Sequence, residues 1–309
     1  MKNVFCLVFL CFAIFSSHSQ IGGTNTFDFI NLNTSPKIIA LGGYLTSVDD
    51  ADINNGIYNP ALINSKMSNR FVLNYSNYYE DIIYGNAGYC FNMAGHSFIG
   101  SIKFIDYGTF IETNEFGHEI GYFDASEYLF SMGVSKILLD SLISVGLNLK
   151  LAYSSFYPEQ SLAGLLDFGC KYNFPEKDVS LSFIVKNVGY QFVTYYNNNR
   201  ESMPLEILFG ISNKLAHMPL RWHLTFQHVE RFDLGFENTN NIESPNVDNF
   251  GYNILRHVVF GAELMIHRNM SLLFGYNNRK RSEMIIEDRK SMIGFSCGFT
   301  FRVNRFNFN

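Results

Sequence analysis

Apolar and polar residues alternate along most of the chain after residue 70, as they do in strands whose two faces meet different surroundings. In the run 143–153 the odd positions are Ile, Val, Leu or Tyr, whereas the even positions are Ser, Gly, Asn, Lys or Ala. The run 293–303 repeats this alternation. Twelve strands are predicted from such runs, at 70–80, 81–93, 95–112, 118–137, 141–154, 161–174, 178–194, 203–214, 218–234, 253–266, 269–279 and 288–303.

The lengths of these runs favour strands that cross a membrane. Strands of soluble proteins average about 5–6 residues, whereas about 9–11 residues are needed to span a bilayer, and most of the runs have the longer length. A soluble two-sheet sandwich would also alternate, so the period alone leaves a secreted all-β protein open. The segment 107–125 has room for an extra hairpin, which gives a range of 12–14 strands.

The connections between the predicted strands alternate in length. Short ones lie at 93–95, 137–140, 174–177, 214–217 and 267–268, and longer ones at 155–160, 195–203, 233–252 and 280–288. Outer-membrane barrels have short periplasmic turns and longer extracellular loops in this alternation. The turns after Glu80 and near Asn114 are short exceptions on the side with long loops. We therefore predict an all-β fold, a transmembrane antiparallel β-barrel that occupies residues 70–309.

The first residues have the form of a secretory signal peptide. Lys2 precedes an apolar stretch from position 4 to 15, and small residues at Ser17 and Ser19 follow it. We predict a signal peptide at 1–19, an N-terminal periplasmic plug segment at 20–69, and a location in the outer membrane of a Gram-negative bacterium. The net charge of −5 excludes a typical nucleic-acid-binding protein. The charged fraction of 17% and the aromatic fraction of 16% also differ from those of a disordered chain.

The plug segment contains two predicted helical turns. Ser35 and Pro36 have the form of a helix start, and Leu41 is followed by the helix-ending glycines Gly42 and Gly43. A second turn opens at the motif Asn59, Pro60 and Ala61. The acidic loop between them, DDAD at 49–52, lacks the glycine turn and distal Glu of a calcium loop, so a solvated turn is favoured.

No enzymatic motif is found, and we predict no catalysis, cofactor or metal. His223 and His228 differ by an odd number, so on one strand they would face opposite sides. The inward carboxylates Asp167 and Glu263 are interpreted as ion-pair partners of Lys150, Lys171 or Arg302 rather than as a catalytic pair. The mixed polar and apolar inner face predicts a narrow or partly plugged lumen, which the segment before the first strand would fill.

The order of ALGG at 40–43, the acidic loop, NPA at 59–61 and the barrel strands resembles the fatty-acid-transporter (FadL-like) superfamily of outer-membrane barrels. Within it, the chain is similar to the PorV/PorQ family of the type IX protein secretion system. The segments that carry this similarity are FDFINL at 27–32, NYSNY at 74–78, DIIYG at 81–85, DYG at 106–108, EFG at 115–117, KNVG at 186–189 and NRE at 199–201. The resemblance implies about fourteen strands and a periplasmic helical plug.

The resemblance also implies a function, the anchoring of a cell-surface attachment complex through extracellular loops. Its partners would be outer-membrane lipid and a surface protein resembling PorZ, with PorU and PorV in the complex. The longest predicted loop, 233–252, is acidic and aromatic, and its candidate partner-binding residues are Phe236, Glu237, Glu243, Asp248, Phe250 and Tyr252. A transporter of hydrophobic small molecules and a simple porin are the alternatives.

Overall fold

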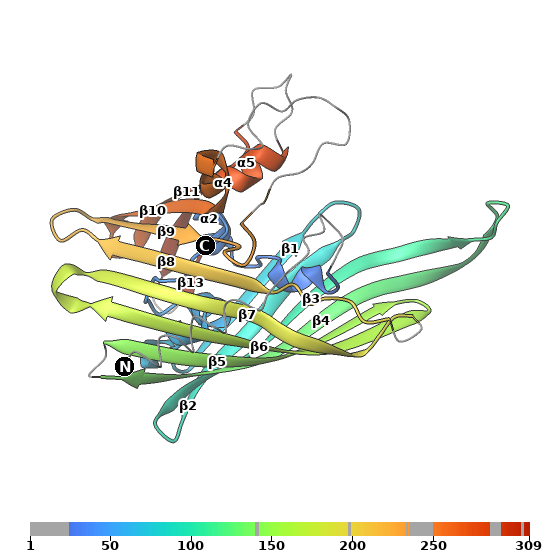
Figure 1. Ribbon diagram of the computed structural model, residues 1–309, viewed down its shortest axis with the longest axis horizontal. Helices are drawn as coiled ribbons and strands as arrows, with labels where there is room; N and C mark the ends of the chain where they lie inside the picture. The colour runs from blue at the N-terminus through green and yellow to red at the C-terminus, as the bar shows by residue number, and fades with distance from the viewer. Residues whose placement is uncertain are drawn as a thin grey trace.

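In the residues that the structure describes, the chain forms one sheet of thirteen antiparallel strands that follow one another in sequence order (Figure 1). The computed structural model describes residues 25–139, 142–196, 199–232, 234, 250–284, 292–303 and 306–309. The predicted signal peptide lies outside these residues. The predicted all-β class is confirmed, and the strand number falls within the predicted range of 12–14.

Each of the twelve predicted strands corresponds to one observed strand, and a short thirteenth follows. The bounds are β1 Arg70–Asn77, β2 Ile83–Met93, β3 His96–Thr113, β4 Glu119–Leu138, β5 Ile143–Phe156, β6 Glu159–Phe174, β7 Val179–Val193, β8 Glu206–Lys214, β9 Leu220–Phe226, β10 Val258–His267, β11 Met270–Asn277, β12 Phe295–Val303 and β13 Phe306–Phe308. The segment 107–125 holds no extra hairpin, because β3 and β4 pair with each other almost to their shared turn.

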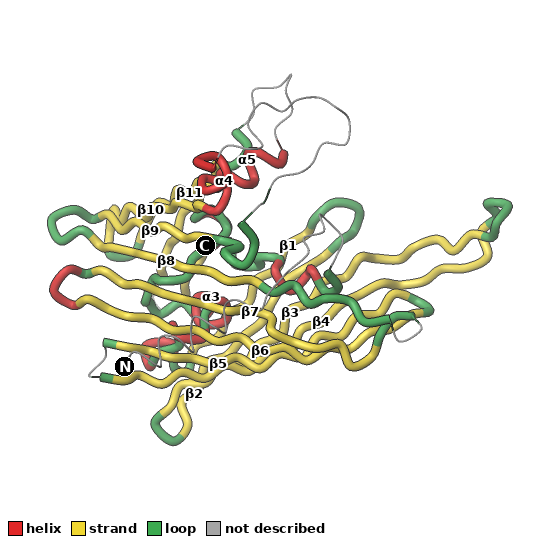
Figure 2. The backbone as a smooth tube through the Cα atoms, viewed as in Figure 1, coloured by secondary structure: helices red, strands yellow, loops and turns green. Residues whose placement is uncertain are grey.

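The helices are short and, apart from one in the turn between β6 and β7, they lie before β1 or beside β10 and β11 (Figure 2). They are η1 Asp28–Asn31, α2 Pro36–Ala40, α3 Ile53–Tyr58, η2 Pro60–Leu62, η3 Ser65–Met67, η4 Pro175–Lys177, α4 Phe250–His257 and α5 Asn278–Met284. In the part of the chain that the structure describes, none of these helices has the length and apolar character of a membrane span. The predicted strand 253–266 is wrong at its start, where α4 places Asn253 and His257 on one buried helical face.

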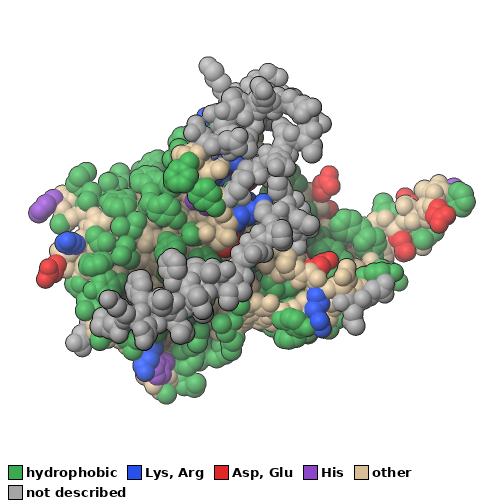
Figure 3. All heavy atoms as spheres, viewed as in Figure 1, with side chains coloured by type: hydrophobic (Ala, Val, Ile, Leu, Met, Phe, Trp, Pro, Cys, Tyr) green, Lys and Arg blue, Asp and Glu red, His purple; other side chains and the backbone are tan. Residues whose placement is uncertain are grey.

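The two faces of the sheet are inverted relative to a soluble protein. On β5, the apolar Leu147 and Leu149 are exposed, Leu149 by 63%, whereas Asn148 between them is only 3% exposed. The same alternation on β12 leaves Phe299 exposed. Hydrophobic side chains accordingly cover much of the visible surface over the strands in Figure 3. These exposures match the alternation in the runs 143–153 and 293–303, with the apolar positions outward and the polar positions inward.

Residues 25–69, here called the inner segment, pack against the polar inner face of the sheet. Helix α3 contacts β1, β2 and β3, whereas α2 contacts β11 and β12 near the other end of the strand order. Because one short segment touches strands at both ends of the order, the sheet must curl around it, as Figure 1 shows. Apolar clusters seal these contacts, among them Phe29 and Ile30 of the inner segment with Ile105 and Leu129 of the sheet.

The sheet is not closed by a ladder between its first and last strands in the described residues. Strand β13 has three residues and pairs with the end of β12. Since every neighbour in the order is antiparallel, β1 and β13 run in the same direction, and a ladder between them would have to be parallel. The observed architecture is thus a curled, open, thirteen-stranded sheet with an inner segment.

Candidate functional site: the inner segment and a projecting hairpin

The local structure of the inner segment confirms the two predicted helical turns. The Ser35 hydroxyl accepts a hydrogen bond from the Ile38 N–H at 3.5 Å and caps α2, and Pro36 opens the helix. Gly42 follows with a φ of 94°, which is the left-handed conformation that ends helices. Asn59 caps η2, because its Oδ1 accepts a hydrogen bond from the Ala61 N–H at 3.0 Å. All six residues of the predicted plug motif, at 41–43 and 59–61, are buried.

Glycines on the inner face of the strands let this motif approach closely. A methyl group on Gly146 of β5 would lie 2.2 Å from the carbonyl carbon of Pro60. One on Gly169 of β6 would lie 2.3 Å from Asn59 Oδ1. Neither distance allows a side chain without movement of the segment. Glycine at these two positions therefore leaves the space that the NPA motif occupies. The residue types alone did not reveal this role.

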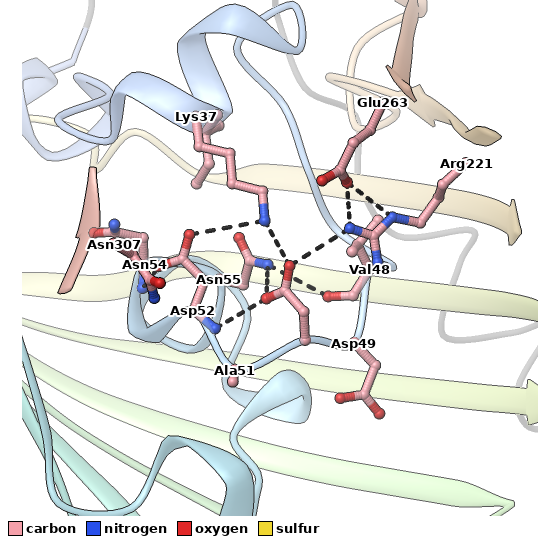
Figure 4. A network of polar contacts seen from close by, with 12 residues as sticks. Lys37, Val48, Asp49, Ala51, Asp52, Asn54, Asn55, Arg221, Glu263 and Asn307 are labelled. Atoms are coloured by element: carbon pink, nitrogen blue, oxygen red, sulfur yellow. Dashed lines mark hydrogen bonds and ion pairs between the residues drawn. The ribbon is translucent and has the colours of Figure 1, made fainter. Parts of the chain in front are cut away.

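The acidic loop is held by basic side chains (Figure 4). Asp50 pairs with Lys37 at 2.5 Å and with Arg221 of β9 at 3.6 Å, and Arg221 also pairs with Glu263 of β10. Asp49 reaches Lys171 of β6 at 2.5 Å. The prediction of a solvated acidic turn is therefore wrong. The loop instead ties the inner segment to strands on two sides of the sheet.

Burial and charge compete in this network. Burial alone would lower the pKa of Lys37, but Asp50 and Asp52 beside it outweigh that effect and raise it. Burial would raise the pKa of Asp50, yet Lys37 and Arg221 lower it below its usual value. For Asp52, burial dominates, and its pKa is raised. Lys37 and Asp50 are consequently both charged at neutral pH, as a structural ion pair requires.

Further ion pairs line the inner face itself. Asp167 of β6 pairs with Lys150 of β5 at 2.5 Å, which confirms one predicted pairing. Glu206 of β8 pairs with Lys186 of β7 at 3.0 Å. The predicted partners of Glu263 are wrong, because Arg221 opposite it on β9 takes that role. In the described residues, no group of His, Cys, Asp and Glu has the arrangement of a metal site.

Strands β3 and β4 form a second candidate region, because their shared hairpin extends far beyond the other strands (Figure 1). They contain 18 and 20 residues, whereas about 9–11 suffice to cross a membrane. The outward apolar rows end at Phe104 on β3 and at Tyr128 on β4. The next outward residues are Asp106 and Ser126, which lie opposite each other in the ladder. Residues 106–124 are here called the projecting hairpin.

The projecting hairpin combines acidic and large apolar side chains. Its exposed or half-exposed carboxylates, with those of the adjacent turn between β1 and β2, are Glu80, Asp81, Asp106, Glu112, Glu115, Glu119 and Asp124. No Lys or Arg occurs from residue 104 to 135. Figure 3 shows red carboxylates along this projection. Phe116 at its tip is 84% exposed, and Ile120 and Tyr122 are exposed beside it. Sequence reasoning missed this region because it measured loop lengths, whereas the signal was the length of the two strands.

The candidate loop of the sequence prediction is only partly visible. Phe236, Glu237, Glu243 and Asp248 lie outside the described residues. Phe250 and Tyr252 lie on α4, where the Phe250 ring is 5.6 Å from that of Phe232. Phe250 is exposed, and the Arg256 guanidinium lies 5.1 Å from the Tyr252 ring centre. These two aromatics therefore belong to a helix beside β10.

Comparison with known proteins adds no relative. A scan against protein-family models and a search of the curated proteins both found no match to this chain.

Proposed function

We propose that this chain is an outer-membrane β-barrel of the FadL-like superfamily, of the PorV/PorQ type, in which the inner segment is the plug. The inverted faces of the sheet support this reading. Exposed Phe, Leu, Met and Tyr side chains recur on the outer face of the sheet, and hydrocarbon is the solvent that would match a large exposed apolar surface of this kind. Buried ion pairs on the other face suit a polar lumen. Closure along β1, β12 and β13 would complete the barrel and remove its open edges.

The orientation in the membrane follows from the connections. One end of the sheet carries the short turns, such as 94–95 and 268–269. The other end carries the long connection between β9 and β10, together with the tip of the projecting hairpin. In outer-membrane barrels the long connections face outward. The projecting hairpin accordingly stands on the cell surface.

The barrel anchors a cell-surface attachment complex of the type IX secretion system in this proposal, and the projecting hairpin is the observation that carries it. A transport path needs strands only long enough to cross the bilayer, so two strands that continue well past it favour contact with a partner. The exposed Phe116 and Tyr122 supply aromatic anchors of the kind that dominate protein interfaces. The surrounding carboxylates would select a basic surface on a PorZ-like partner. PorU and PorV would join the same complex.

The test removes the projection without touching the wall. Phe110 and Phe123 face each other in the ladder, so residues 111–122, which include Phe116 and Tyr122, are replaced by Asn-Gly, a two-residue hairpin turn. We expect a folded, heat-modifiable barrel that no longer co-purifies with its surface partner, and cargo released into the medium. The matched control is Glu176→Lys in the exposed turn η4 at the opposite end, which should leave attachment intact.

A different result would reject the proposed anchor. A truncated barrel that keeps its surface partner and cargo but takes up hydrophobic compounds abnormally would reject the anchor and favour the transporter.

A further inference from the structure

The projecting hairpin has two outer edges that no other strand covers. The ladder between β2 and β3 ends at Asp106, and the ladder between β4 and β5 ends at Ala125. The ladder between β3 and β4 continues past both, as far as Thr113 and Glu119. In the part of the chain that the structure describes, each strand of the hairpin therefore pairs only with the other (Figure 1). A row of backbone N–H and C=O groups along each outer edge is left without a strand partner.

The edge of β3 is partly blocked. A bulge interrupts its register between Asp106 and Thr109. Within the bulge, Gly108 has a φ of 79°, and its N–H donates to the Asp106 carboxylate at 2.9 Å. The turn between β1 and β2 lies beside this edge, because a methyl group on Gly108 would be 3.7 Å from Cβ of Asp81. Bulges of this kind protect an edge against pairing with another strand.

The edge of β4 is regular by contrast. Residues 121–124 pair with residues 112–109 without a shift of register. On the side of the sheet, β5 pairs with β4 as far as Phe156, and the chain then turns toward β6. An added strand beside 121–124 would therefore continue the line that β5 follows along β4. An exposed edge of this form is the template for strand addition by an extended peptide.

The side chains of the hairpin also favour a third strand. An isolated two-stranded hairpin is only marginally stable in water, and a third strand is usually needed. The rings of Phe110 and Phe123 stack at 5.3 Å on one face, and Phe110 remains exposed. Ile111 and Tyr122, which pair with each other on the opposite face, are exposed as well. A strand beside β4 would cover part of both faces.

The charge of this edge indicates the chemistry of the added strand. Glu119 and Asp124 are exposed at either end of it, and no Lys or Arg occurs from residue 104 to 135. Opposite charges on neighbouring strands attract, whereas like charges that face each other repel. The edge therefore fits a strand with basic side chains and rejects an acidic one.

We infer that the projecting hairpin holds its partner by strand addition. An extended segment of the partner, in which Lys or Arg alternates with apolar residues, pairs with β4 along residues 121–124. Backbone hydrogen bonds supply the affinity, and the contacts of the basic side chains with Glu119 and Asp124 supply the specificity. This inference rests on the proposed function, because it takes the hairpin to be the surface that binds the partner.

The test uses the full-length chain in detergent and a short probe peptide that alternates Lys with Val. Backbone hydrogen exchange is measured residue by residue with and without the peptide. We expect the amides of 121–124 that face the free edge to exchange at least about tenfold more slowly with the peptide bound, and those of 109–112 to be unchanged. The same peptide with Glu in place of Lys should give no protection.

Two matched variants separate strand addition from general attraction to an acidic surface. Asp124→Lys places a like charge beside the added strand and should weaken peptide binding by about tenfold or more. Asp81→Lys makes the same change of charge beside the blocked edge of β3, and it should have a much smaller effect. Equal losses in the two variants would reject strand addition.

The hydrogen exchange of the unaltered protein decides the matter even if a variant does not fold. Absence of protection at 121–124, or equal protection on both edges, would overturn the inference. If replacement of 111–122 by Asn-Gly releases the surface partner while the peptide protects no amide, the anchor stands and strand addition is rejected. If that replacement leaves the partner bound, the proposed function itself is rejected.

Discussion

The β3–β4 pair has one part within the curled sheet and another in the projecting hairpin, and the two parts show how the surroundings of a strand determine its residues. Within the sheet, Ile105 and Leu129 are buried under the inner segment, while Phe130 and Met132 face outward. In the projecting hairpin, the consecutive residues Phe110 and Ile111 are both exposed, so neither face is covered. Within the sheet the two strands thus have one covered and one exposed face, whereas in the projecting hairpin both faces are exposed.

The role of a carboxylate also differs between the two parts of the sheet. A carboxylate on the inner wall, such as Asp167, is fully buried and compensated by Lys150. A carboxylate on the projecting hairpin, such as Asp124, is exposed, and it accepts a hydrogen bond from the neighbouring Thr109 hydroxyl at 2.7 Å. The first type of carboxylate holds the fold together, whereas the second is available to a partner.

Neutralising one carboxylate in each region should give the largest difference in the free energy of unfolding. Asp167 also accepts a hydrogen bond from the Asn187 N–H at 2.8 Å, where a bulge interrupts the ladder between β6 and β7. Asp167→Asn leaves Lys150 buried without a counter-charge, which costs about 3–5 kcal/mol. Asp124→Asn should cost no more than about 0.5 kcal/mol. Urea unfolding, followed by the fluorescence of Trp222, measures both variants, and equal losses would contradict the contrast.

A second difference is expected on the outer surface. Leu149 on the wall and Ile120 on the projecting hairpin are exposed to almost the same extent, 63% and 60%. An Arg at the bilayer midplane of a barrel costs about 2–4 kcal/mol, whereas an Arg in water costs little. Leu149→Arg should therefore reduce the heat-stable, folded fraction on gels, and Ile120→Arg should not. If both variants fold equally well, the wall does not face lipid.

The strands and their faces were predictable because they depend on near neighbours. The period of two predicted the strands β1 to β12 and put Leu149 and Asn148 on opposite faces of one strand. The cap at Ser35 was equally local. The contacts of Asp50 were not predictable in this way, because Arg221 lies on a distant strand and approaches only when the sheet curls.

The candidate site was less accessible to sequence reasoning than the fold. Loop length pointed to residues 233–252 as the candidate site. In the described residues, however, the projecting hairpin extends furthest from the sheet, and its turn is short. The glycines that receive the inner segment carry no chemical signal of their own. Gly146 and Gly100 are both strand glycines in the sequence, and only the structure shows which one faces Pro60.

The smallest expected effect on stability tests that last distinction. Gly146→Val would force a side chain into the backbone of Pro60, and overpacking of this kind costs about 1–3 kcal/mol. We expect the inner segment to detach locally while the sheet stays folded, so that trypsin cleaves after Lys37, which is buried in the unaltered protein. Gly100→Val is the control, because no atom lies within 4 Å of the added carbon. Cleavage after Lys37 in both variants, or in neither, would show that the NPA motif does not depend on the space at Gly146.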